Sequence, residues 1–466
     1  MSDTDDKTKG RRRGRAARKA IREAPIPDDK RVIYPGMEGG LFKPLKERDV
    51  ERIHQAALHV LETVGFADAI PSCVEMVTNA GGSISPEGRL LFPRALVEDT
   101  IANAARNFPL YAQDPKYDLE PWGNKVHFGT AGAAVHMYDS EKHEYRESTL
   151  KDLYEIARLV DNLDNIHFFQ RSVVPRDVIE PEAVDINTAY ACVTGTSKHV
   201  GTSMVTAENT QKVLEMLHII AGGEDKWRAR PFVSQSNCFV VPPMKFAEDA
   251  CACLEVAVRG GMPVLLLAAG QAGATSPAAL AGAVMQETAE VLAGLVYVNL
   301  IVPGHPAIFG TWPFVSDLRT GAMSGGSGEQ ALLSAACAQM ANFYDLCGGV
   351  PAGMTDAKTP DAQHGYEKGY TETLLAHAGA NLIYESAGMQ GSLLGFSKEA
   401  LVIDNDMIGG IQRTIRGIDV TEDSLSVEAL RNVCLEGPGH YLGHDQTLEL
   451  MESEYVYPDI GDRKSP

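Results

Sequence analysis

The segment FGTWPF, residues 309–314, places three aromatic rings, those of Phe309, Trp312 and Phe314, close together in the chain. The faces of such rings attract cations, and a quaternary ammonium must be held in this way because it has no N–H to donate. A carboxyl group, from Glu385 or Asp356, would balance its charge. The three rings therefore predict either a cage for a quaternary amine or ordinary core packing, and the sequence alone leaves both open.

The remaining candidates around this site are mostly uncharged. A substrate carboxylate needs hydrogen-bond donors, for which we expect Gln170, Arg171, Asn237 and Gln271. His364 lies in the first turn of a predicted helix that begins near Pro360, where it either reaches a ligand or serves as a buried structural histidine. We predict as the catalytic residues His364, Glu385 and Asp356.

Most of these residues lie near the ends of short apolar runs that alternate with helical patterns. The predicted strands are 125–130, 165–170, 199–205, 231–238, 263–270, 306–311, 350–356 and 381–386. The predicted helices are 149–160, 180–193, 207–221, 245–259, 277–300, 328–346, 360–377 and 397–416. Strands that alternate with helices indicate parallel pairing, because a parallel connection needs a long crossover. The pattern predicts an α/β fold, a (β/α)8 TIM barrel over residues 125–416, with its active site at the carboxyl ends of the strands.

Three segments flank the predicted barrel. Residues 1–31 form a basic tail that we expect to be disordered, or else to dock on another subunit. Residues 32–124 form an N-terminal cap with predicted helices at 43–66 and 95–105, and residues 417–466 form a C-terminal extension. A hairpin is predicted within residues 134–147, after the first strand.

The charge balance limits the classes of partner. The net charge is −20, and the 11 basic and 6 acidic residues of positions 1–31 leave the remainder near −25. Such an acidic body repels phosphate backbones, so nucleic acid is not an expected partner. No apolar segment follows the basic run and no run of about 18 apolar residues occurs, so we expect neither secretion nor a membrane span. The eight cysteines are scattered, as is typical of buried thiols in a cytoplasmic protein.

Motifs for nucleotides and metals are weak. Neither dinucleotide-binding nor phosphate-binding glycine motifs occur, and we interpret the Gly-rich residues 321–328 as a flexible loop more readily than as an anion site. His440 and His444 are four residues apart, as metal ligands on a helix are, but Gly443 weakens helicity. We therefore favour local capping or interface contacts for these histidines and expect no metal bound directly by this chain.

Several longer motifs together are more specific. They are RRRGRAAR at 11–18, GMTDAKTPDAQHGYEK at 353–368, LVIDND at 401–406, GPGHYLGH at 437–444 and EYVYP at 454–458. In these the chain resembles the trimethylamine methyltransferase family over nearly its whole length. The resemblance implies a (β/α)8 barrel that passes a methyl group from a methylamine to the cobalt of a corrinoid protein.

Two departures from the family pattern matter. The trimethylamine enzymes carry pyrrolysine in the barrel, whereas every residue here is standard, so the chain is similar to the non-pyrrolysine branch that acts on glycine betaine and related quaternary amines. The chain ends at Pro466, where relatives tend to run on, so we expect it to lack a final helix.

The resemblance implies a quaternary amine as methyl donor and a corrinoid carried by a partner protein as acceptor. A quaternary nitrogen is already a leaving group, so orientation and electrostatics suffice and no general base is needed. His364 would then position the substrate or the corrin. Alternatives are methyl transfer to tetrahydrofolate, transfer from another methylamine, or a betaine-binding barrel without turnover. We also expect the chain to assemble with copies of itself.

Overall fold

The structure is a computed structural model that describes residues 31–130 and 132–463. These residues form two compact units. The larger unit comprises Pro35–Gly417 with residues 458–463, and the smaller one comprises Ile418–Tyr457 with residues 31–34. The predicted basic tail lies outside the described residues except for Arg31.

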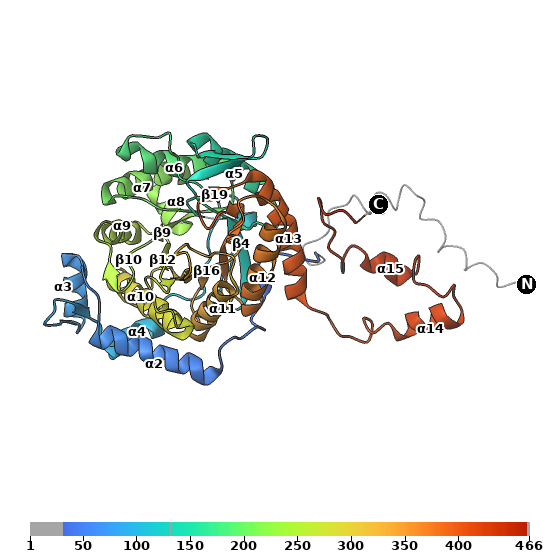
Figure 1. Ribbon diagram of the computed structural model, residues 1–466, viewed down its shortest axis with the longest axis horizontal. Helices are drawn as coiled ribbons and strands as arrows, with labels where there is room; N and C mark the ends of the chain where they lie inside the picture. The colour runs from blue at the N-terminus through green and yellow to red at the C-terminus, as the bar shows by residue number, and fades with distance from the viewer. Residues whose placement is uncertain (1–30, 131, 464–466) are drawn as a thin grey trace, which may run out of the picture. The chain divides into compact units, whose positions relative to one another are not determined.

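Eight parallel strands form a barrel in the larger unit (Figure 1). They are β4 (Lys125–Thr130), β7 (Phe168–Gln170), β8 (His199–Thr202), β9 (Val233–Asn237), β12 (Val264–Ala268), β14 (Ala307–Thr311), β16 (Gly349–Pro351) and β17 (Leu382–Ala387). β17 pairs with β4, and Phe309 of β14 bridges to Gly348 just before β16, so the ring closes. The predicted (β/α)8 barrel is confirmed, with a strand at each of the eight predicted places.

A ring of helices surrounds the strands (Figure 1). It consists of α5 (Leu150–Val160), α6 (Pro181–Gly195), α7 (Ala207–Ala221), α9 (Glu248–Arg259), α10 (Leu280–Ile301), α11 (Gly328–Phe343), α12 (Ala362–Ala378) and α13 (Lys398–Arg416). Five of these begin at a residue whose side-chain oxygen accepts a backbone N–H of the first turn: Thr149, Thr206, Ser327, Asp361 and Ser397. Such caps satisfy N–H groups that a helix start leaves unpaired, which explains why the helices begin where they do.

The interior of the barrel is a packed core. Leu265, Ile308, Leu382 and Tyr384 from three strands pack with Phe168 from a fourth, and segment 108–119 adds further apolar side chains. Small residues make room for this packing. A Cβ on Gly349 would lie 2.7 Å from Cγ2 of Ile308. The barrel is therefore filled by side chains, as in other barrels of this class.

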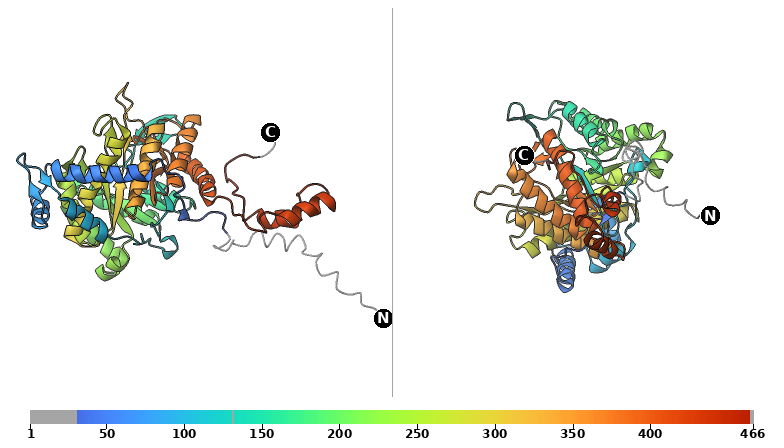
Figure 2. Two further views of the ribbon diagram at one scale, coloured as in Figure 1. Left: turned by 90° about the horizontal axis from the view of Figure 1, so that it is seen from below. Right: turned by 90° about the vertical axis from the view of Figure 1, so that its right-hand side faces the viewer.

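The N-terminal segment is anchored on the barrel. β1 (Met37–Glu38) pairs antiparallel with β4, and α2 (Glu47–Thr63) packs along α10 and α4 (Arg94–Asn103), as Figure 2 shows. The buried side chains of α2 recur at helical spacing, which explains why its periodicity was visible in the sequence. α3 (Pro71–Asn79) and the hairpin β2 (Ser83–Ile84) with β3 (Leu90–Leu91) were not predicted.

Several connections differ from the predicted pattern. The helix expected from residue 245 begins at Glu248, because Lys245–Phe246 (β11) pairs with Val240–Val241 (β10) in a hairpin. α8 (Glu224–Ala229) and the 3-10 turn η2 (Pro115–Tyr117) are additional elements. The predicted hairpin is confirmed as β5 (His136–Asp139) with β6 (Glu144–Glu147). Further short strands extend the loops: β13 (Gln271–Ala272), β15 (Phe314–Val315), β18 (Met389–Gln390) and β19 (Gly395–Phe396).

The smaller unit contains α14 (Val427–Leu435) and α15 (Asp445–Leu450). The side chain of His444 caps α15 by accepting the backbone N–H of Gln446 at 3.2 Å. Capping is thus the observed role of this histidine. Within residues 31–130 and 132–463, no group of three or more His, Cys, Asp or Glu side chains is arranged to hold a metal ion.

Within the described chain, one helix, α10, is long and apolar enough to cross a membrane by length and composition. Most of it, 78% of its most apolar window, is buried inside the protein, and it carries the buried carboxyls Glu287 and Glu290. These features identify α10 as a core helix of the barrel.

Candidate active site

The mouth of the barrel, meaning the carboxyl ends of the eight strands, contains one carboxyl group in an unusual setting, that of Glu385. This residue has φ of 68°, a left-handed conformation that is rare outside glycine. Its Oε1 accepts the backbone N–H of Gly132 at 3.1 Å, whereas its Oε2 is buried and has no hydrogen-bond partner within the described chain. One oxygen of Glu385 therefore has unused hydrogen-bonding capacity.

Burial raises the pKa of Glu385 to about 8. The hydrogen bond from Gly132 and the positive charge of Lys368 act in the opposite direction but are weaker than the desolvation. Without a ligand the carboxyl therefore holds its proton at neutral pH. A cation beside it would favour the ionised form.

Gln170, a predicted site residue, lies directly beside this carboxyl. A Cβ on Gly132 would lie 3.3 Å from Oε1 of Glu385 and 3.6 Å from Cγ of Gln170, so the three residues are in mutual proximity. The amide of Gln170 donates to Oγ of Ser236 at 2.9 Å. The structure thus places Gln170 and Glu385 together at the mouth.

Two of the three predicted cage rings also lie on this side of the barrel. The ring centroids of Trp312 and Phe314 are 6.4 Å apart, and Trp312 is 5.4 Å from Tyr384, the residue before Glu385. Tyr384 in turn contacts Phe168 at 5.0 Å. The indole nitrogen of Trp312 is buried with no partner among the described residues. Sequence reasoning missed Tyr384, whose position beside Glu385 in a strand was the available signal.

Trp312 has a dual environment, because it also belongs to the apolar core of the barrel. Its backbone N–H donates to Oε2 of Glu287 at 3.2 Å, and the other oxygen of that carboxyl accepts from Gly270 at 2.5 Å. Burial, together with the neighbouring Glu290, raises the pKa of Glu287 well above its usual value. This acid, which the sequence analysis did not select, fixes the ends of β12 and β14 and so the position of Trp312.

Phe309 requires a correction, because it does not belong to this aromatic group. Its ring packs against Tyr344 at 5.7 Å, at the end of α11 on the outer side of the barrel wall. Side chains alternate along a strand, and Ile308 of the same strand faces the interior. The predicted three-ring cage is therefore reduced to Trp312 and Phe314 from this segment.

Two predicted amide ligands are also placed away from Glu385. Asn237 donates from its side chain to the carbonyl of Ala250 in α9, at 2.9 Å, and so faces the helix layer. Gln271 lies in β13, beside Phe314 of β15 and half-buried at the rim. Of these two, only Gln271 lies next to an aromatic residue of the site.

The carboxylate of Asp356 accepts hydrogen bonds from the loop that follows β15. Its Oδ1 accepts the backbone N–H of Gly325 at 2.8 Å, and its other oxygen accepts from Ser324 at 3.1 Å. Ser392 also donates to this carboxylate. The Gly-rich loop 321–328 therefore binds a carboxylate of its own chain, and this contact explains the position of Asp356 better than a catalytic role does.

His364 is buried and hydrogen-bonded to the carboxylate of Asp404. Its Nε2 lies 2.8 Å from Oδ1 of Asp404, and Lys368 contacts the other oxygen of that carboxylate at 2.9 Å. The alternative of a buried structural histidine fits this arrangement. Arg171 directly follows β7, and its Nε is buried without a partner in the described residues. Burial lowers the pKa of its guanidinium, and the nearby Asp185 acts in the opposite direction.

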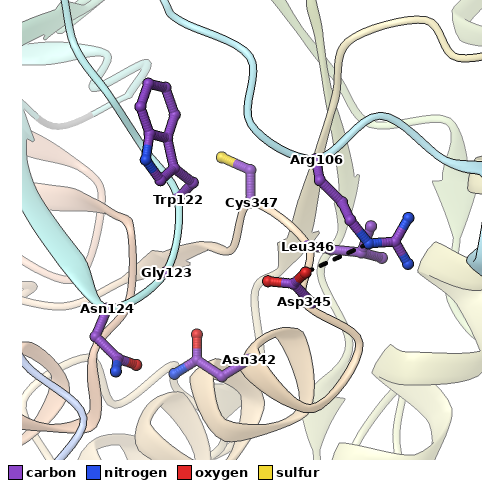
Figure 3. Close-up of a pocket in the computed structure, with 8 residues that line it drawn as sticks. All are labelled: Arg106, Trp122, Gly123, Asn124, Asn342, Asp345, Leu346 and Cys347. Carbon is purple, nitrogen blue, oxygen red and sulfur yellow. Dashed lines mark ion pairs between the residues drawn. The ribbon is translucent and has the colours of Figure 1, made fainter.

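One cavity among the described residues lies at the other end of the barrel. It has a volume of about 200 Å³ and lies beside the start of β4 and β16, at the amino-terminal end of the barrel (Figure 3). Arg106 and Asp345 form an ion pair of 3.5 Å across it, and Trp122 and Cys347 line it. Catalysis in this class of barrel occurs at the opposite, carboxyl end.

The fold and this mouth define an α/β-barrel enzyme. Solved structures of the monomethylamine methyltransferase MtmB of Methanosarcina barkeri share the fold, with a TM-score of 0.51, 10% identity, and coverage of 86% of this chain and 88% of that one. A hydroxylamine complex of MtmB gives a TM-score of 0.54, 11% identity, and coverage of 89% and 82%. At such identities the likeness establishes the architecture only.

The chain belongs to the trimethylamine methyltransferase family, because the family model described as "Trimethylamine methyltransferase (MTTB)" matches residues 11–466. It is similar to the trimethylamine methyltransferase MttB of Methanosarcina thermophila, with 34% identity over 90% of this chain and 86% of that one. The MttB protein of Desulfitobacterium hafniense (strain DSM 10664 / DCB-2) is 32% identical over 90% and 84% of the two chains. A glycine betaine methyltransferase of Desulfitobacterium hafniense (strain Y51) is 29% identical over 91% and 88%. The resemblance found in the sequence motifs is thereby confirmed, and the chain is a methyltransferase of this family.

Proposed function

We propose that the protein transfers a methyl group from a quaternary amine of the glycine betaine type to the Co(I) of a corrinoid carried by a separate protein. Family membership and the similarity to a glycine betaine methyltransferase support this reaction class. The standard residues throughout the chain favour a quaternary rather than a tertiary amine. The site would consist of Glu385, Trp312 and Phe314, with Gln170 beside the carboxyl.

The observation that carries the proposal is the half-satisfied, buried carboxyl of Glu385, which follows the aromatic residue Tyr384 in β17. A quaternary ammonium offers no hydrogen bond, so it must be held by charge and by ring faces. The free Oε2 of Glu385 supplies the charge, while Tyr384 and Trp312, whose ring centroids are 5.4 Å apart, supply the rings. A buried acid that ionises only when a cation arrives also discriminates against neutral amines.

The proposed reaction does not require acid–base catalysis by the protein. One carbon–nitrogen bond breaks, its electron pair remains on nitrogen, and the methyl carbon bonds to the metal nucleophile that the corrinoid supplies. Dimethylglycine would leave from glycine betaine as a neutral amine carrying its carboxylate. The residues of this chain bind the ammonium, orient its methyl and exclude water, and none of them has to accept a proton from the substrate.

We assign the corrinoid to a partner protein, as the resemblance to the trimethylamine methyltransferase family implies. The acidic composition of the chain is compatible with docking such a protein. We further propose a cytoplasmic location and assembly into a homo-oligomer. All eight cysteines lie in the described chain and are free thiols, which supports a reducing compartment.

The test is to incubate the purified protein with glycine betaine and cob(I)alamin and to measure dimethylglycine by mass spectrometry. Dimethylglycine that depends on both the protein and the reduced corrinoid would support the proposal. Carnitine, choline and trimethylamine form the comparison panel. Absence of corrinoid-dependent demethylation across the panel would contradict it.

The alternatives predict different results in the same assay. Demethylation that requires tetrahydrofolate and proceeds without corrinoid indicates a folate acceptor. Demethylation of trimethylamine but not of betaines indicates another methylamine as donor. Calorimetric binding of betaine without product under either condition indicates a binding protein that does not turn over.

A further inference from the structure

Two of the sequence motifs, residues 353–368 and 401–406, meet behind strand β17. α12 carries His364 and Lys368, and α13 carries Asp404. The carboxylate of Asp404 is 2.8 Å from Nε2 of His364 and 2.9 Å from Nζ of Lys368. Lys368 and Asp404 are completely inaccessible to solvent, and His364 is nearly so. The proposed reaction uses none of these three side chains directly.

A contribution to stability does not by itself explain why a buried ion pair of this kind is present. The cost of removing two charges from water roughly cancels their attraction, and apolar replacements are often neutral. A more informative question is what the network holds in place. Asp404 Oδ2 accepts the backbone N–H of Gly388 at 2.7 Å, and Lys368 donates to the carbonyl of Ser386 at 3.1 Å. Both backbone groups lie within three residues of Glu385.

The backbone at Glu385 needs such support. The pairing of β17 with β4 loses its register between Ile383 and Ala387, and within this interruption Glu385 adopts its left-handed φ of 68°. A residue with a Cβ stays in that conformation only where its surroundings determine it. Ser386 adds a further restraint by donating from Oγ to the carbonyl of Gly129 at 2.6 Å.

The same network sets the electrostatic environment of Glu385. Lys368 is the charged residue whose attraction favours the ionised carboxyl, against the effect of burial. The groups that surround Lys368 are Asp404, His364 and Glu372. Both oxygens of Glu372 are buried without partners in the described chain, and burial raises the pKa of Glu372 well above the usual range.

We propose that Asp404, Lys368 and His364 form a positioning network that fixes the Glu385 turn and directs its carboxyl toward a quaternary ammonium at the mouth of the barrel. This inference rests on the proposed function for the identity of the ligand. It reassigns His364 from a catalytic residue to a positioning residue. It also explains why two motifs separated in the sequence occur together in this chain.

The decisive measurement needs no ligand. Urea-unfolding free energies of the protein and of Glu385→Gln are compared from pH 5 to pH 10, because the difference between them reports the titration of Glu385 in the folded state. The comparison is then repeated in a Lys368→Met/Asp404→Leu background, which removes the ion pair as a unit. We expect the midpoint of the titration to rise by about one pH unit or more, since a stabilising positive charge is lost.

A control and a second variant separate this role from a general loss of packing. Arg146 and Asp152 form an ion pair of 2.7 Å at α5 that does not contact the Glu385 turn. Arg146→Met/Asp152→Asn should leave the midpoint unchanged. If the double replacement of the network fails to fold, Asp404→Asn, which keeps the size of the side chain, is measured instead; because it leaves the charge of Lys368 without its partner, the midpoint should then fall. An unchanged midpoint in the folded network variant overturns the inference.

A second experiment measures the binding of tetramethylammonium by calorimetry. We expect the network variant to bind it at least about tenfold more weakly than the unmodified protein at pH 7.5, and to lose this effect in a Glu385→Gln background. An equal loss in that background would show a structural role only and would contradict the inference. If the unmodified protein binds no quaternary ammonium while the midpoint still shifts, the proposed function fails but the control of Glu385 by the network stands.

Discussion

Replacing Glu385 by Gln is the most direct perturbation of the site, because it removes the titrating group and keeps its shape. The pKa of Glu385 is raised from 4.5 to about 8 in the folded protein. Between these values the unfolded chain has released a proton that the folded protein keeps. Stability therefore falls as pH rises, by about 1.4 kcal/mol per pH unit for this one group, and stays constant above pH 8.

The magnitude at neutral pH follows directly. From pH 4.5 to pH 7 the ionisable carboxyl costs the protein about 3 kcal/mol relative to a glutamine that keeps the hydrogen bond from Gly132. Glu385→Gln should thus be nearly as stable as the unmodified protein at pH 4.5 and clearly more stable at pH 7. Urea unfolding of both proteins at half-unit pH intervals measures the difference. A stability difference that does not change between pH 5 and pH 8 would refute the assignment of a buried, protonated carboxyl.

The same group links cation binding to pH. A quaternary ammonium beside Glu385 favours the ionised form, so binding releases a proton below pH 8. Affinity for tetramethylammonium should rise about tenfold per pH unit up to that point and then level off. Calorimetry in two buffers of different ionisation enthalpy measures the proton released. Glu385→Gln should bind weakly with no pH dependence, and a proton release equal to that of the unmodified protein would show that another group is responsible.

Three further predictions concern other positions in the barrel. Trp312→Leu should weaken tetramethylammonium binding by about tenfold. Phe309→Leu should lower only the melting temperature, because Phe309 faces α11. Equal effects of the two replacements on binding would contradict the placement of Trp312 at the site and of Phe309 outside it. In Gly201→Ala the new Cβ would lie 1.9 Å from Oε1 of Gln170. We expect kcat/KM to fall because the side chain of Gln170 is displaced from Ser236. An unchanged kcat/KM would exclude a role for the Gln170 amide. Lys198→Met should lower the free energy of unfolding in urea by about 3 kcal/mol, because Nζ of Lys198 donates to the carbonyls of residues 160, 163 and 166. A loss of unfolding free energy below about 1 kcal/mol would show that water replaces these hydrogen bonds.

Local signals in the sequence were sufficient for the architecture. The caps at Thr149 and Ser397, the alternation of strand and helix, and the glycine-rich connections each act over a few residues, so they are visible without a structure. The short strands within loops and the late start of α9 were missed, because two-residue pairings such as Val240–Val241 with Lys245–Phe246 leave no periodic pattern.

The site was only partly accessible from the sequence. Glu385, Gln170, Trp312 and Phe314 were selected because they lie at or just after the carboxyl ends of predicted strands, and the structure places them at the mouth. Phe309 was assigned to the wrong side, since both faces of a barrel strand are buried and apolar pattern alone cannot separate inward from outward positions. Glu287 was missed because a buried acid on a long apolar helix has no local signature.

The sequence by itself determined the eight repeated strand–helix units and, through its motifs, the family. Only the tertiary structure decided which carboxyl is poised to bind a cation. Burial raises the pKa of Glu385, Gly132 binds one of its oxygens, and Lys368 and Asp404, 36 residues apart in the chain, hold the turn that presents the other. Burial and charge pairing depend on residues that are close in space and distant in sequence, so the properties of this group arise only when the barrel closes.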